Sequence, residues 1–194
     1  MSAVSARDFP REMLPDIAIG GRSNVGKSSL VNVLTGTKLA RISSTPGKTR
    51  MVNFYRFQRA FFLVDLPGYG YARVSKAESR QWRELVNQYF VRRPAIALVI
   101  HLVDSRMNPT ALDFQFAQWL DHLGMPRLIV GTKSDKLSGR GRAVQQRAIS
   151  EAFGGEPVIL SSAVTGAGCK EIWKKVAEAA ESIDPRTKSS VNEN

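Results

Sequence analysis

The feature that most constrains this chain is the octapeptide at 21–28, GRSNVGKS, which has the pattern G-x-x-x-x-G-K-S. Between a buried strand and a helix, this pattern forms a phosphate-binding loop. Its glycines let backbone N–H groups turn inward, and the helix N-terminus adds partial positive charge. The flanking segments fit, because PDIAIG at 15–20 predicts a strand and SSLVNVL at 28–34 predicts a helix. A chance match is expected in about one chain of this length in a hundred or fewer. We therefore interpret 21–28 as a P-loop.

The P-loop supplies the first candidate residues. We expect Lys27 to reach the β- and γ-phosphates of a nucleotide, and Ser28 to bind Mg²⁺ through its hydroxyl. The loop contributes these candidates for the nucleotide site: Gly21, Arg22, Ser23, Asn24, Val25, Gly26, Lys27 and Ser28.

Predicted strands and helices alternate along the rest of the chain. The segments 51–57 and 60–64 predict a hairpin, whereas the apolar runs at 95–103 and 127–131 predict strands buried on both faces of a parallel sheet. Helical spacing predicts helices over 75–91, 109–123, 143–153 and 169–182, with a loop at 138–142. His101 lies inside an apolar run and is expected to be a hydrogen-bonded core residue.

These elements predict one α/β P-loop domain over 14–183, with helices on both faces of its sheet. We expect a mostly parallel sheet of six strands, one of them antiparallel. Residues 1–13 are expected to form an irregular, loosely packed leader, and 184–194 a frayed tail.

Charge and composition indicate the surroundings and the partner. There are 28 Lys and Arg residues against 17 Asp and Glu, a net charge of +11, and no acidic residue occurs from 17 to 63. This distribution favours a polyanionic partner such as nucleic acid; a solvated basic surface is the alternative. One cysteine, no secretory signal and no long apolar run predict a cytoplasmic protein without a membrane partner, expected to be a monomer.

Four further polar loops lie where carboxyl ends of strands are predicted, which is where ligands bind in such sheets. They are GKTR at 47–50, DLPG at 65–68, TKSD at 132–135 and SSA at 161–163. With the P-loop, this ordered set resembles the five signature motifs of translation-factor-class GTPases. By that resemblance Asp65 holds magnesium through water and the Gly68 N–H meets the γ-phosphate. Thr49 becomes a second magnesium ligand when the γ-phosphate is present, with Thr45 as a competing candidate.

The same resemblance makes the nucleotide GTP or GDP. Asp135 would accept hydrogen bonds from guanine N1–H and its exocyclic amine, neither of which adenine offers. Lys133 would lie along the base, and 161–163 would donate N–H groups to guanine O6. Thr132 replaces the asparagine of N-K-x-D, so we expect it to brace the loops less well. These loops add the following site candidates: Gly47, Lys48, Thr49, Arg50, Met51, Asp65, Leu66, Pro67, Gly68, Thr132, Lys133, Ser134, Asp135, Ser161, Ser162 and Ala163.

In detail, GRSNVGKSSL, STPGKTR, DLPGYGYA and TKSD resemble the bacterial ribosome-biogenesis GTP-binding proteins called EngB, YihA or YsxC. The resemblance spans nearly the whole chain. It implies a role in assembly of the large ribosomal subunit, with that subunit or its rRNA as partner, and a link to normal cell division and septation.

Tyr69 stands where small signalling GTPases carry the glutamine that orients the attacking water. Slow hydrolysis is therefore expected until a partner completes the site or another group supplies charge. Lys27 and Asn24 are the catalytic candidates, Asn24 as a contact for K⁺, although it could instead bond its own backbone. The alternatives are an RNA-binding assembly factor with a regulatory nucleotide site, and a P-loop kinase, which Asp135 and Lys133 argue against.

Overall fold

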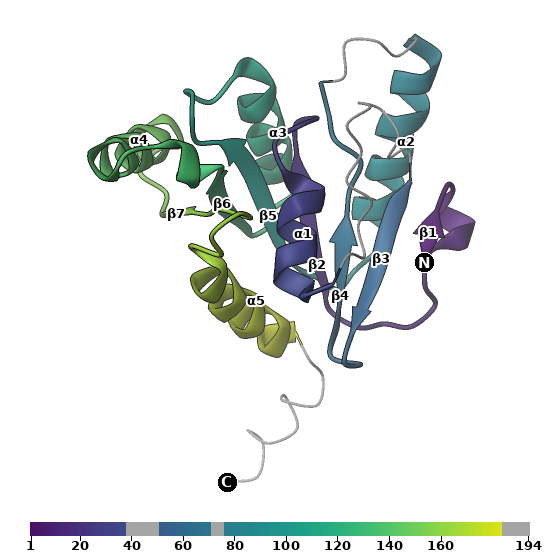
Figure 1. Cartoon of the computed structure of the whole chain (residues 1–194). Coiled ribbons are helices and arrows are strands. Elements are labelled where there is room, and N and C mark those ends of the chain that lie inside the picture. Colours follow the sequence, from purple (N-terminus) through teal and green to yellow (C-terminus); the bar gives the residue numbers. More distant parts are fainter. Residues whose placement is uncertain (38–50, 71–75, 184–194) are drawn as a thin grey trace, which may run out of the picture.

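The computed structural model describes residues 1–37, 51–70 and 76–183. Within these residues the strands form a seven-stranded sheet in the order β1-β3-β4-β2-β5-β6-β7 (Figure 1). The strands are β1 Ser2–Ala3, β2 Asp16–Gly21, β3 Val52–Phe57, β4 Phe61–Asp65, β5 Ile96–Asp104, β6 Arg127–Thr132 and β7 Val158–Leu160. Five strands are parallel from β4 to β7, while β3 runs antiparallel to β4 and β1 antiparallel to β3.

Helices cover both faces of this sheet (Figure 1). They are α1 Lys27–Thr35, α2 Lys76–Arg92, α3 Ala111–His122, α4 Gly139–Ala152 and α5 Cys169–Ile183, with short 3₁₀ turns η1 Ala6–Asp8 and η2 Ser134–Lys136. None of the helices in the described ranges is both long and apolar enough to cross a bilayer.

Side-chain alternation along β2 produces the two layers. Ile17 and Ile19 pack in a core cluster with residues of α1 and α5, whereas Ala18 packs in a second cluster with residues of α2 and α3. Successive residues of a strand point to opposite faces, so consecutive apolar residues such as those at 17–19 can serve both layers. The predicted α/β architecture is confirmed.

The first thirteen residues differ from the expected loose leader. Ala3 is fully buried and pairs with Val52 in the β1–β3 ladder, which adds a seventh strand to the expected six. The ring of Phe9 packs on that of Phe54, with centroids 5.7 Å apart. Arg93 binds the carbonyls of Pro10 and Glu12 at 2.8 and 3.2 Å, and so fixes the segment. All these partners come from distant parts of the chain, so no local sequence pattern predicted the contacts.

The turn between β3 and β4 and the start of α4 can be compared with the sequence predictions. Gln58 and Arg59 join β3 to β4 with positive φ values of 45° and 60°, which confirms the predicted hairpin. The loop expected at 138–142 was wrong, because α4 begins at Gly139. Ser138 caps that helix by accepting a hydrogen bond from the Gly141 N–H at 3.1 Å, and this cap offsets the poor helix propensity of two glycines.

Candidate nucleotide-binding site

The predicted site loops follow the carboxyl ends of neighbouring strands. The P-loop follows β2, DLPG begins at the last residue of β4, TKSD begins at the last residue of β6, and 161–163 follow β7. Because these strands are parallel neighbours or near neighbours, their ends place the four loops at one edge of the sheet. Met51 joins this edge, since Asn53, two residues on, pairs with Asp65 in the β3–β4 ladder.

The P-loop has the backbone that a phosphate cradle requires. Gly26 adopts φ of 107° at the N-cap of α1, a backbone conformation that residues other than glycine rarely adopt. The N-terminus of α1 therefore opens directly onto the loop, with Ser28 in its first turn. Lys27 is buried and its Nζ lies 2.6 Å from Asp65 Oδ1, so each buried charge compensates the other.

The DLPG loop is tied to the P-loop by its backbone. The Tyr69 N–H donates to the Gly21 carbonyl at 3.2 Å, and the Ser23 N–H donates to the Tyr69 carbonyl at 2.9 Å. Leu66 and Pro67 of this loop are buried. A Cβ at Gly68 would lie 3.0 Å from the Ser23 nitrogen, a tight contact, so the close approach of the two loops favours glycine there.

The two loops predicted to contact the base, at 132–135 and 161–163, are also joined. The Ser134 N–H donates to the Ser161 carbonyl at 3.0 Å, and the Ser162 hydroxyl donates to Asp135 Oδ1 at 2.7 Å. This hydroxyl is the main cause of the lowered pKa of Asp135, which favours the carboxylate form that can accept from guanine. The loops line a cavity of about 140 Å³, whose walls are Gly26, Ser29, Leu30, Thr132, Lys133, Asp135, Lys136, Ser161, Ala163 and Val164.

Thr132, which replaces the asparagine of N-K-x-D, contacts two neighbouring segments. Its buried hydroxyl lies 2.6 Å from the Val25 carbonyl of the P-loop and 3.2 Å from the Val103 carbonyl of β5. The shorter contact is the principal hydrogen bond, because one hydroxyl proton serves one acceptor well. Threonine thus links the base loop to the phosphate loop directly.

Lys133 makes a second link between the same loops. Its Nζ donates to the Asn24 carbonyl at 2.7 Å and to Asp104 Oδ2 at 2.9 Å. Burial alone would raise the pKa of Asp104, but hydrogen bonds from Arg106 and Lys133 hold it well below its usual range. Asp104 was missed in the sequence, although a carboxylate at the end of an apolar strand was a usable signal. Asn24 has φ of 64° and an exposed side chain.

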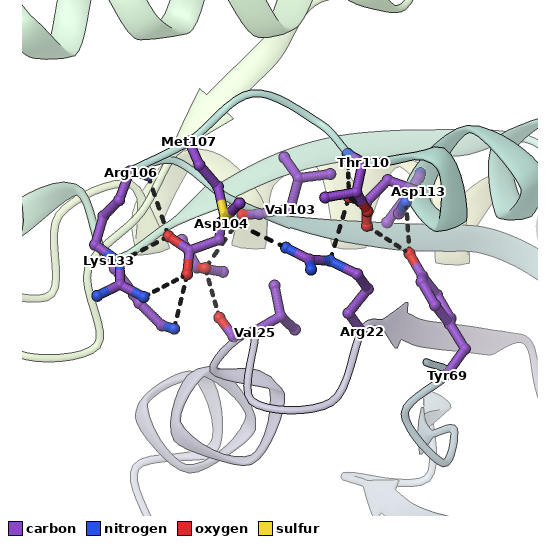
Figure 2. Close-up of polar contacts among 12 residues, drawn as sticks. Arg22, Val25, Tyr69, Val103, Asp104, Arg106, Met107, Thr110, Asp113 and Lys133 are labelled. Atoms are coloured by element: carbon purple, nitrogen blue, oxygen red, sulfur yellow. Dashed lines mark hydrogen bonds and ion pairs between the residues drawn. The ribbon is translucent and has the colours of Figure 1, made fainter. Parts of the chain in front are cut away.

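Tyr69 does not point its hydroxyl toward solvent. The side chain is buried, and its hydroxyl donates to Asp113 Oδ1 at 3.1 Å and lies 3.1 Å from His101 Nε2 (Figure 2 shows Tyr69 and Asp113). The predicted core role of His101 is thereby confirmed. Among the predicted site residues, Gly47, Lys48, Thr49 and Arg50 lie outside the described residues, as does the alternative Thr45.

The comparisons with known proteins identify the family of this chain. The model of a family described as "50S ribosome-binding GTPase" matches residues 16–133. The "Probable GTP-binding protein EngB" of Acidobacterium capsulatum is 45% identical over 193 residues, covering 94% of this chain and 92% of the relative.

Two solved structures show the same fold. A crystal structure of a probable GTP-binding protein engB has a TM-score of 0.71 at 24% identity, covering 86% of this chain and 99% of that one. Era in complex with MgGDPNP and nucleotides 1506-1542 of 16S ribosomal RNA has a TM-score of 0.71 at 23% identity, covering 87% of this chain and 57% of Era. By the motifs, the geometry and the identity over most of its length, the chain belongs to the EngB family of GTP-binding proteins.

Proposed function

We propose that this chain is a GTP-driven switch with slow intrinsic turnover, acting in the cytoplasm as a monomer during assembly of the large ribosomal subunit. Normal cell division and septation would depend on that role. The observation that carries the proposal is the physical linkage of the phosphate loop to the base loop through Thr132 and Lys133. One guanine nucleotide would span the two linked loops, and the DLPG loop would report its γ-phosphate through the Gly68 N–H.

Magnesium fits the donors at the phosphate end of the site. Ser28 offers a hydroxyl in the first turn of α1, and Asp65 offers a carboxylate, the hard oxygen ligands that Mg²⁺ prefers. We assign Ser28 as a direct ligand, Asp65 as a ligand through water, and Thr49 as the ligand added with GTP. When bound, the metal supplies positive charge to the phosphate oxygens. Asn24 is our candidate for a K⁺ contact, which with Lys27 would stabilise charge during hydrolysis.

Slow turnover follows from the buried hydroxyl of Tyr69. A side chain that donates to Asp113 inside the protein cannot orient the attacking water as glutamine does. The same observation favours a second candidate function, an RNA-binding assembly factor whose nucleotide site is regulatory and whose turnover is negligible. Measuring GTP turnover with and without large ribosomal subunits separates the two. Stimulation by the subunit supports the switch, whereas turnover that stays at background supports the regulatory site.

The ribosomal partner is supported by charge and by the family. No acidic residue occurs from 17 to 63, and the family model is described as ribosome-binding. Era, which shares this fold, holds ribosomal RNA in its solved structure. On the described part of the stretch, Arg59 is exposed at the hairpin tip, and Arg56 pairs with Glu12 at 2.7 Å in an exposed ion pair of small energetic value.

The test is co-sedimentation with ribosomal subunits in GTP, GDP and nucleotide-free buffer across a salt series. We expect GTP-favoured, steeply salt-dependent binding to the large subunit, because phosphate contacts release counterions. Neutralising Lys38, Arg41, Arg56 and Arg59 should weaken binding and flatten the salt slope without changing GTP affinity. The matched control neutralises four basic residues of α4 and α5: Arg140, Lys170, Lys174 and Lys175. Equal behaviour of the two fourfold variants would contradict the assigned surface.

A further inference from the structure

One buried carboxylate joins two loops of the predicted nucleotide site to a helix. Asp113 lies in the first turn of α3 and is 1% exposed. Its Oδ1 accepts from the Tyr69 hydroxyl of the DLPG loop at 3.1 Å. Its Oδ2 lies 3.3 Å from Arg22 Nε of the P-loop and accepts from the Thr110 N–H and hydroxyl, both at 2.8 Å (Figure 2). The P-loop, the DLPG loop and α3 therefore meet at Asp113.

The protonation states of Tyr69 and His101 determine which group donates in each hydrogen bond around Asp113. Burial, reinforced by the negative charge of Asp113, raises the pKa of Tyr69 far above its usual value, so the phenol keeps its proton and donates it to Asp113. Burial lowers the pKa of His101 to about 4, so its ring is neutral near pH 7. With the Tyr69 proton committed to Asp113, the ring donates from Nε2–H to the Tyr69 oxygen. The ring of Tyr69 also packs on Phe116, with centroids 5.0 Å apart.

The anchored side chain fixes the backbone beside it. Tyr69 pairs with the P-loop through its own N–H and carbonyl, at Gly21 and Ser23 respectively. Gly68 precedes it and lies so close to Ser23 that a Cβ would be 3.0 Å from the Ser23 nitrogen. The position of the Gly68 N–H is therefore determined on one side by the P-loop and on the other by the buried tyrosine.

We propose that Asp113 is a positioning residue for γ-phosphate recognition, which acts by anchoring Tyr69 and thereby holding Gly68 against the P-loop. GTP then binds a loop that is already in place and loses less free energy to ordering it. This inference rests on the γ-phosphate contact of Gly68 proposed above. In this view Tyr69 anchors the DLPG loop and does not orient the attacking water.

The anchor predicts an effect on selectivity between nucleotides. GDP has no γ-phosphate for Gly68 to contact, so its affinity should be insensitive to the anchor. A variant that lacks the anchor should lose affinity for the triphosphate alone. A residue that merely stabilises the fold would lower both affinities together or neither, so the ratio of the two dissociation constants distinguishes these roles.

The experiment titrates GDP and a non-hydrolysable GTP analogue into wild type and Tyr69→Phe by calorimetry, with magnesium present. This change removes the hydroxyl and keeps the buried ring. We expect the Kd of the GTP analogue to rise about 5- to 20-fold and that of GDP to stay within about twofold. Tyr89→Phe is the matched control, because Tyr89 is a fully buried tyrosine of α2, an element outside the Asp113 contacts described above. Equal Kd ratios in the two variants would overturn the proposal.

Two more variants distinguish the positioning role of Asp113 from the γ-phosphate contact of Gly68 on which it rests. Asp113→Asn keeps the volume of the side chain and removes its charge, and it should shift the Kd ratio in the same direction as Tyr69→Phe. An unchanged ratio in Asp113→Asn would also overturn the positioning role. Gly68→Ala tests the γ-phosphate contact itself. If Gly68→Ala weakens binding of the analogue and Tyr69→Phe does not, the contact stands and the anchor is refuted. If Gly68→Ala leaves the ratio unchanged, both fail.

Discussion

Replacing Thr132 with valine tests how the TKSD loop at 132–135 and the P-loop at 21–28 are held together. The two side chains have nearly the same shape, so the change removes the hydroxyl that lies 2.6 Å from the Val25 carbonyl without opening a cavity. Thr132 is 4% exposed, so water cannot readily take the place of the lost donor. Leaving a buried acceptor without its partner costs about 1–3 kcal/mol. We expect the free energy of unfolding to fall by about 2 kcal/mol.

Part of this loss should also appear in nucleotide affinity. In the binding mode proposed above, a guanine nucleotide would place its phosphates on the P-loop and its base on the loop at 132–135, so it would need the spacing that this hydrogen bond maintains. If about 1 kcal/mol of the loss falls on binding, the Kd for GDP rises about fivefold. Lys133, whose Nζ donates to the Asn24 carbonyl at 2.7 Å, retains a second link and limits the effect.

The assays are urea denaturation followed by circular dichroism, and calorimetric titration with GDP. Thr132→Ser is the matched control, since it keeps the hydroxyl and should stay closer to wild type in both measurements. If Thr132→Val has the unfolding free energy and GDP affinity of the wild type, the hydroxyl does not brace the two loops and this reasoning is refuted.

Three further predictions concern buried charge and base recognition. Asp16→Asn leaves Arg93, 3% exposed, without its charge partner and should cost about 3 kcal/mol of stability, with an unchanged urea midpoint as the contrary result. His101 has a pKa of about 4 in the folded protein and about 6.5 in the unfolded chain, so the unfolded chain binds the proton more readily. The contribution of neutral His101 to folding stability is therefore complete above pH 6.5 and is lost as the pH falls toward 4. His101→Gln should flatten this part of the stability curve, and His122→Gln, at an exposed position, should not. Asp135→Asn should weaken GTP binding and admit xanthine nucleotides; calorimetry that finds unchanged GTP affinity would remove its role as base reader.

The parts of the fold that the sequence predicted are those whose information is local. The G-x-x-x-x-G-K-S pattern located a strand, a turn and a helix at once, because glycine conformations and the helix start are set within a few residues. The helix expected at 169–182 agrees with α5 at Cys169–Ile183 because its apolar face repeats at helical spacing. Buried strands were equally clear, since β5 is buried along all of its nine residues.

What the sequence did not predict depends on partners far along the chain. β1 is only two residues long and exists because Val52 lies beside it in space. The role of Asp113 depends on Arg22 and Tyr69, which are 91 and 44 positions away in the sequence. A carboxylate near a helix start is first interpreted as a cap, and Asp113 is one, so its second role had no signal of its own.

The ion pair of Asp16 with Arg93 has a consequence for the order in which the chain can fold during synthesis. The two residues are 77 positions apart, and both are buried. At about 5–20 residues per second, the ribosome needs about 4–15 s to add that length. Throughout that interval β2 has neither β5 beside it nor the arginine that neutralises its first residue. The phosphate loop can therefore be formed early by its local glycines, yet the strand that carries it becomes stable only once the chain has been made through Arg93 and the whole of β5, which ends at Asp104.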